Sequence, residues 1–180
     1  IRGNLTLAAG SRTFSPPPAP PAWTDDHTDK NAASRFLTQA TFGPRISDIT
    51  TLQGAASYEA WIDDQFAKPV NTHLPEVIRT ENASTQGGAY DENLTFNTWW
   101  WRSVTADDQL RQRIAFALSE TLVVSAQGPL DNNALSLSYF YDVLIQDAFG
   151  NFRDILEDVT LTPTMGRYLD MLRNDKPDQG

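Results

Sequence analysis

The 180-residue sequence contains no cysteine and only two histidines, His27 and His73. Without cysteine, the chain has no disulfides, no thiolate metal sites and no cysteine nucleophile. Because there are only two histidines and they lie far apart in the sequence, a histidine-rich metal site and a Ser-His-Asp triad are both disfavoured. The absence of cysteine leaves the compartment open, since many exported bacterial proteins also lack it.

Basic residues are also few: Lys and Arg number 14 against 23 Asp and Glu, which gives a net charge of −9. An acidic chain repels phosphate backbones and anionic membrane surfaces, so we expect no nucleic-acid partner. No apolar run approaches the roughly 18 residues that a membrane helix needs, so we expect no membrane span. We find no secretory signal in the sequence, and expect that it was removed or was never part of this piece.

Residues 1–31 are expected to form an extended N-terminal segment with a proline-rich linker. Residues 1–15 alternate weakly between polar and apolar side chains, as the last strand of a preceding β domain or a simple tail would. Residues 15–21 read Ser-Pro-Pro-Pro-Ala-Pro-Pro, and proline fixes φ and removes a hydrogen-bond donor. This stretch is therefore interpreted as an extended spacer, which is favoured over a ligand for a proline-binding module.

From residue 32 onward, apolar side chains recur at helical spacing, and no strand-like alternation competes with them. Ser57 and Thr162 are expected N-caps, and Thr105 with Asp108 resembles a capping box. The fold class is therefore all-α, a multi-helix orthogonal bundle with an extended, proline-rich N-terminal arm. Helices are expected near residues 32–40, 47–53, 57–68, 97–103, 106–124, 133–149, 152–159 and 163–172, with a loop over 70–92.

The helix expected over 106–124 is apolar nearly all round, which predicts a place at the centre of the fold. It carries two charged residues, Arg113 and Glu120, which are seven positions apart and so lie on one side. They are the candidate catalytic residues, as a substrate clamp or as an acid–base carboxylate held by an arginine. A structural role, in which each charge pairs with a neighbouring helix, is the favoured alternative.

Three consecutive tryptophans and an arginine occupy positions 99–102. Aromatic faces bind sugar rings, and tryptophan beside arginine can hold anions, so Trp100, Trp101 and Arg102 are candidate binding residues. Neighbouring helical residues point about 100° apart, so the three rings cannot form one flat platform. We expect two of the three rings to be buried and one to lie at an interface.

Asp154, Glu157 and Asp158 form an acidic patch on the helix expected over 152–159. Carboxylates at this spacing could hold Ca²⁺, but a solvated helix face is the favoured explanation. We therefore assign no residue to a metal, and the cofactor remains unknown.

Several ordered segments match one family pattern: Ala33–Pro44, Tyr58–Phe66, Trp100–Arg102, Gln109–Glu120, Val123–Ser125, Ala148–Leu156 and Thr164–Leu169. Together they resemble the bacterial family called domain of unknown function 1800. The resemblance covers about residues 32–180. Arg167, in the last of these segments, joins the candidate binding residues.

The resemblance implies a largely helical, exported protein, so a secreted or periplasmic location is expected. Members of the family are generally longer than this chain and are often encoded beside a second exported family that resembles sulfatases. A sulfatase-like protein is therefore a candidate partner. The family pattern continues with Asn-x-x-Tyr-Ala-Arg-Glu and His-Thr-x-Gly segments that this sequence lacks. Residues 32–180 are accordingly expected to be the N-terminal part of a helical domain, completed by the remaining C-terminal part of the same protein or by a second chain.

Three functional hypotheses follow, and they leave open whether the chain is an enzyme. In the first, an exported bacterial protein binds or processes an extracellular polymer in a cleft lined by Arg113 and Glu120. In the second, the chain is a non-catalytic surface or assembly module. In the third, it is part of a haem- or metal-dependent enzyme whose ligands lie in the missing C-terminal part. Loss of binding or turnover in a folded Arg113→Ala variant would favour the first or third.

Overall fold

The computed structural model describes residues 18–19, 22, 24–83 and 92–171, and within them the chain is all-α, as predicted. The expected strand or tail over 1–15 and most of the proline-rich spacer lie outside the described residues. No helix in the described part combines the length and the apolar composition of a membrane-spanning segment. The elements in chain order are α1 (Lys30–Ala40), α2 (Ile46–Gln53), α3 (Tyr58–Ala67), α4 (Leu74–Ala83), α5 (Glu92–Thr105), α6 (Gln109–Ser119), the 3-10 turn η1 (Gly128–Leu130), α7 (Ala134–Gln146), α8 (Phe152–Thr160) and α9 (Pro163–Tyr168).

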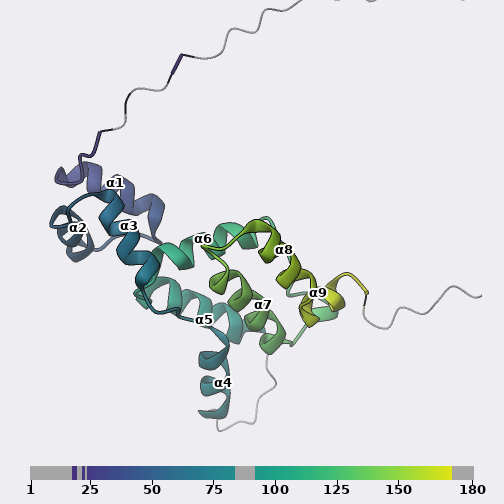
Figure 1. Ribbon diagram of the computed structural model, residues 1–180. Coiled ribbons are helices and arrows are strands. Elements are labelled where there is room, and N and C mark those ends of the chain that lie inside the picture. Colours follow the sequence, from purple (N-terminus) through teal and green to yellow (C-terminus); the bar gives the residue numbers. More distant parts are fainter. Residues whose placement is uncertain (1–17, 20–21, 23, 84–91, 172–180) are drawn as a thin grey trace, which may run out of the picture.

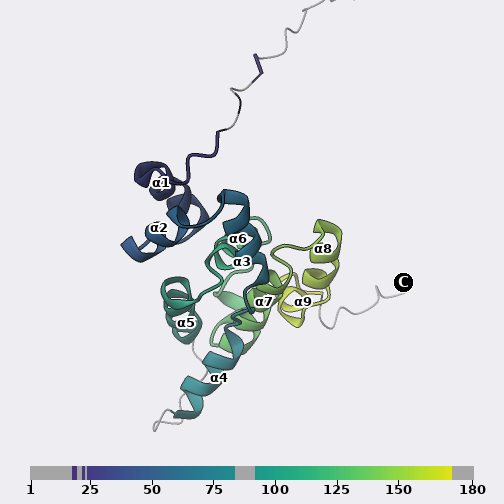
Figure 2. The same ribbon diagram turned by 60° about the vertical axis from the view of Figure 1, so that its left-hand side comes forward.

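Two hydrophobic clusters hold the helices together. The first joins α1, α2 and α3 through buried residues that include Leu37, Leu52 and Trp61. The second joins α6, α7 and α8, with Leu144 and Ile155 among its buried members. Figure 1 places α1–α3 at one end of the molecule and α7–α9 at the other, with α6 between them, and Figure 2 likewise separates α1 and α2 from α8 and α9.

The innermost helix is α7: eight of its 13 residues are buried, and α4, α5, α6, α8 and α9 all contact it. The helix predicted over 106–124 does lie between the two clusters, but it is not the enclosed core helix that its apolar pattern predicts. α6 is shorter, and it bridges the two clusters, because Leu110 packs against the first while Ala115 lies in the second. Ile114 stays only half-buried. Apolar side chains on several sides of α6 therefore serve two separate contacts instead of one enclosing core.

Local capping signals are confirmed at two helices and wrong at a third. The Ser57 hydroxyl accepts from the Ala60 amide at 3.0 Å, and the Thr162 hydroxyl accepts from the Met165 amide at 3.1 Å. Thr105, however, belongs to the last turn of α5, where its hydroxyl donates to a backbone carbonyl. The expected capping box therefore does not form.

α4 lies in the segment 70–92 that the sequence predicts to be a loop. Its first turn is held by a side chain from another helix, since the Asp142 carboxylate accepts from the amides of His73 and Leu74 at 2.5 and 3.0 Å. Val77 is the buried residue of this helix. Because α4 has one buried apolar residue and a cap that comes from α7, its own sequence gives little indication of a helix.

Candidate functional site

A pocket of about 550 Å³ lies between α5, α7 and the C-terminal part of α6. Small-molecule sites in proteins typically measure roughly 300–1,000 Å³ and are mostly apolar with a few polar groups. We call this site the aromatic pocket. The described residues that line it are His73, Thr95, Phe96, Trp99, Trp100, Phe116, Ser119, Glu120, Val123, Val124, Ala126, Leu137, Phe140 and Tyr141.

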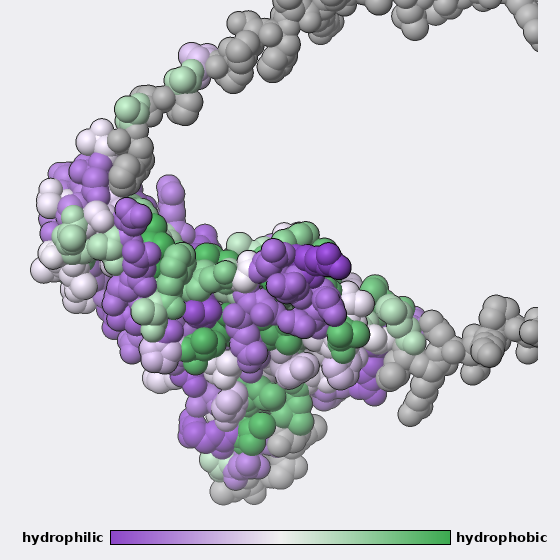
Figure 3. Space-filling view, viewed as in Figure 1, coloured by the Kyte–Doolittle hydropathy of each residue, from purple (hydrophilic) through white to green (hydrophobic). Residues whose placement is uncertain are grey.

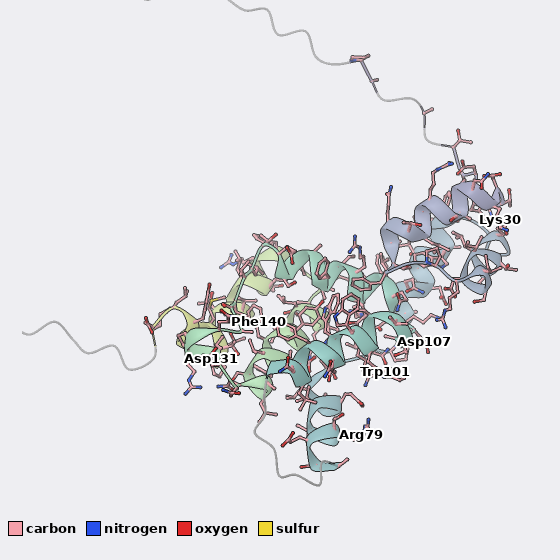
Figure 4. The ribbon with its side chains drawn as sticks, turned by 180° about the vertical axis from the view of Figure 1, so that it is seen from behind. Lys30, Arg79, Trp101, Asp107, Asp131 and Phe140 are labelled. Carbon is pink, nitrogen blue, oxygen red and sulfur yellow. The ribbon has the colours of Figure 1, made fainter. Side chains whose placement is uncertain are left out.

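The outer wall of the aromatic pocket is built from tryptophan rings of α5. Trp100 is 65% exposed, and its ring meets that of Trp99 edge to face, with 5.0 Å between the centroids. Trp99 packs in turn against Phe116 of α6 at 5.5 Å. Figure 4 shows ring side chains filling the space between α5 and α6, in the region between the labelled Phe140 and Trp101.

The prediction that two of the three tryptophans are buried is wrong. Trp100 and Trp101 are both exposed and Trp99 is half-buried. The inward side of α5 carries the small polar residues Thr98 and Ser103, which are buried. Small side chains allow close packing against neighbouring helices and leave the large rings to the outside. Of the two exposed rings, Trp100 lines the aromatic pocket and Trp101 does not.

The inner wall is a connected set of polar rings. The Trp99 indole N–H donates to the Tyr141 hydroxyl at 2.8 Å, and the Tyr141 ring stacks on His73 with centroids 4.8 Å apart. His73 Nε2 lies 3.1 Å from Oε1 of Gln112, whose amide nitrogen donates to the Asn71 carbonyl. Because an amide oxygen can only accept, Nε2 of His73 carries the proton. Its Nδ1 is then an acceptor, and it has no partner among the described residues.

Burial keeps both rings of the inner wall neutral at pH 7. Burial lowers the pKa of His73 to about 4, assisted by the positive charge of Arg102 and opposed by the Gln112 hydrogen bond. Burial also raises the pKa of Tyr141 to about 12, with a further contribution from the negative charge of Glu120. The pocket therefore offers a protonated phenol and an unprotonated imidazole nitrogen.

Behind this wall lies a buried polar network that joins the segment before α4 to α6. The Asp108 carboxylate is fully buried and accepts from both the backbone amide and the side-chain amide of Asn71 at 3.0 Å. Arg111 Nε lies 3.8 Å from the same carboxylate, and the guanidinium sits over the Phe149 ring at 4.4 Å. These partners satisfy Asp108 within the protein, so the network fixes helix positions.

The structure brings the candidate catalytic residues Arg113 and Glu120 to one shallow groove of about 510 Å³ on α6, where they form no ion pair among the described residues. Arg113 is half-buried, donates to the Gln39 carbonyl at 3.4 Å and lies over the rings of Phe42 and Phe116. Glu120 caps the end of α6 and is exposed. Glu120 also lines the aromatic pocket, whereas Arg113 does not.

The buried charges at the start of α6 are Arg111, which the sequence did not single out, and Asp108, which was expected only as part of a capping box. Their i, i+3 spacing is a signal for a helical ion pair. His73 offers no comparable signal, because its side-chain partner Gln112 lies 39 positions away. The place of His73 in the pocket wall becomes visible only once α4 is packed against α7.

The other predicted site residues lie outside the aromatic pocket. Arg102 is half-buried, and its Nε has no partner among the described residues. Arg167 is exposed in the last turn of α9. The acidic patch of α8 is exposed too, and Figure 3 shows the outward face of α8 as hydrophilic. The described residues contain no group of three or more His, Cys, Asp or Glu arranged to hold a metal ion.

Comparison with known proteins gives one match. The model of the family described as protein of unknown function (DUF1800) matches residues 35–179. No curated protein and no solved structure matches the chain.

Proposed function

Since the chain belongs to the DUF1800 family of proteins of unknown function, we propose a role from its own geometry: it binds a chain of neutral sugar rings in the aromatic pocket. The observation that carries this proposal is the exposed Trp100 ring at the mouth of a pocket of about 550 Å³. Such a ring offers a flat apolar face, and the pocket behind it supplies a small number of polar groups.

The polar groups of the aromatic pocket suit hydroxyl groups. Glu120 supplies a carboxylate that accepts hydrogen bonds, and Tyr141 supplies a phenol that keeps its proton. A sugar ring combines an apolar face with hydroxyls around its edge. It can therefore stack on a tryptophan while its edge bonds to these groups.

Charge favours a neutral polymer over a sulfated or otherwise anionic one. None of the described residues that line the pocket is Lys or Arg, and Glu120 places a negative charge on its rim. The net charge of −9 acts in the same direction, because it repels anions at a distance. A sulfatase-like partner, if it acts with this protein, would then leave a desulfated chain as the ligand.

We propose binding and not cleavage for this site. Glycosidases generally place two carboxyl groups on either side of the bond they cleave. Among the described residues of the aromatic pocket, Glu120 is the one carboxylate. We also propose, from the family resemblance alone, that the protein is exported. Cell fractionation of the native host tests that location.

The test is isothermal titration of the full chain with neutral hexasaccharides of glucose, xylose and mannose, using Trp100→Ala and Trp101→Ala as a matched pair. Both tryptophans are exposed neighbours on α5, but only Trp100 lines the pocket. We expect Trp100→Ala to lower the affinity about tenfold, as the loss of one stacked ring would, and Trp101→Ala to bind like the wild type. Equal losses in the two variants, or tighter binding of a sulfated hexasaccharide, would contradict the proposal.

A further inference from the structure

The most buried of the described residues that line the aromatic pocket is His73, whose side chain is fully buried. One edge of the ring is tied by Nε2 to Gln112, and one face is covered by Tyr141. The Gln112 amide is itself oriented by donation to the Asn71 carbonyl at 2.8 Å. These contacts fix both the orientation of the imidazole and the nitrogen that carries its proton.

The second nitrogen of this ring is an unexplained polar atom. Nδ1 of His73 is buried and has no hydrogen-bond partner among the described residues. Buried side-chain polar atoms in proteins almost always have a partner, and each exception calls for an explanation. By contrast, both ring nitrogens of His27 are engaged, with the Asp25 carboxylate at 2.5 Å and the Ala55 carbonyl at 3.0 Å.

We infer that Nδ1 of His73 accepts a hydrogen bond from a hydroxyl of the bound sugar and thereby helps to select hydroxyl-bearing rings. The inference rests on the proposed function, because it assigns a specificity-determining residue to the same pocket. A site built to receive a hydroxyl rejects a ligand that lacks it, since the buried acceptor is then left unpaired.

The arrangement at the inner wall fits this role. Tyr141 stacks on His73, and its hydroxyl accepts from Trp99, so the phenol proton can turn toward the ligand. Both residues line the aromatic pocket, Tyr141 with a hydroxyl that can donate and His73 with an imidazole nitrogen that can accept. A hydroxyl can accept from the first and donate to the second at once. Neutral imidazole is required for this, and burial together with the charge of Arg102 keeps the ring unprotonated at pH 7.

Two substitutions separate recognition from structure. In His73→Gln, the amide nitrogen can still donate to Gln112, but the acceptor at the Nδ1 position is lost. In His73→Asn, the shorter amide places an oxygen near the Nδ1 position, but the bond to Gln112 is lost. We expect His73→Gln to lower the affinity for the glucose, xylose or mannose hexasaccharide that binds by about 3- to 10-fold with little change in stability. His73→Asn should bind within about twofold of the wild type although it unfolds more easily. Affinity that follows stability in both variants would overturn the inference.

A second readout is the ¹⁵N spectrum of the imidazole nitrogens, because the chain has two histidines. In the free protein we expect the Nδ1 signal of His73 to be that of a bare nitrogen, and to move upfield when the hexasaccharide is added. The signals of His27 should stay in place, and the Trp100→Ala variant should show no shift at the same concentration.

The two proposals can fail separately. If a hexasaccharide binds, Trp100→Ala weakens it, and neither the His73 signal nor the His73→Gln affinity changes, then the His73 inference is wrong and the proposed function stands. If none of the three hexasaccharides binds the wild-type chain, both are wrong.

Discussion

His73 and Asp142 respond to pH in opposite directions, because burial disfavours the charged form of each. The pKa of His73 falls to about 4 from 6.5, with burial as the main cause. The pKa of Asp142 rises to about 6 from 3.8 because its burial outweighs the two amides that it accepts from. As the pH falls from 6.5 to 4, the unfolded chain takes up a proton at His73 that the folded chain refuses, so stability is lost. Over nearly the same range the folded chain takes up a proton at Asp142 first, so stability is gained.

In a variant without this histidine, the gain in stability that Asp142 gives at low pH should no longer be opposed. We expect the free energy of unfolding of His73→Gln to rise relative to that of the wild type between pH 6.5 and pH 4. The size of this relative gain is on the order of 3 kcal/mol, because each pKa unit corresponds to about 1.4 kcal/mol. Urea unfolding of both proteins across this range measures it. Parallel curves at all pH values would mean that His73 does not titrate as described.

At the scale of single residues, the sequence identified α6 as the helix with functional candidates, but it did not predict which of its charged residues are buried. Arg113 and Glu120 do lie on one side of α6, as their spacing predicts. Spacing alone, however, does not say which side of a helix meets its neighbours. The partners that bury Arg111 and Asp108 come from α7 and from the segment before α4, and their positions depend on the whole packing.

At the scale of single elements, helices with caps from their own sequence were predictable and α4 was not. Ser57 and Thr162 sit directly before the helices that they cap, so a short motif identifies each of them. The cap of α4 is Asp142, which is 69 positions from His73 in the sequence. The extra length of α5 beyond residues 97–103 has a similar origin, since it packs on both α4 and α7.

The tertiary cap makes α4 the element most sensitive to one distant residue. Asp142→Ala leaves the two amides of His73 and Leu74 without their acceptor, which should cost about 2 kcal/mol or more. Amide hydrogen exchange at pH 7 should become much faster in α4. Thr162→Ala is the matched control, because it removes the local cap of α9 at a cost of about 1 kcal/mol. Faster exchange confined to α9 in both variants, or slow exchange in α4 after Asp142→Ala, would contradict this account.

At the scale of the molecule, the aromatic pocket exists because α6 joins two clusters instead of lying inside one. α6 ends at Ser119, the chain turns, and the residues after it meet α5 and α7 around the pocket. The sequence predicted an all-α fold and marked the tryptophans, but the placement of α5 against α6 and α7 depends on contacts between distant segments. That the domain is completed by residues outside this chain stays a prediction.

The most direct test of sugar binding in the aromatic pocket is the spectrum of the tryptophan indole N–H groups, recorded while a neutral hexasaccharide is added to the full chain. Trp99 and Trp100 line the pocket, whereas Trp61 is buried in the first hydrophobic cluster. The account predicts that the signals of Trp99 and Trp100 move in proportion to binding while that of Trp61 stays still. Saturable binding that moves the signal of Trp61 or Trp101 and leaves those of Trp99 and Trp100 unchanged would contradict it.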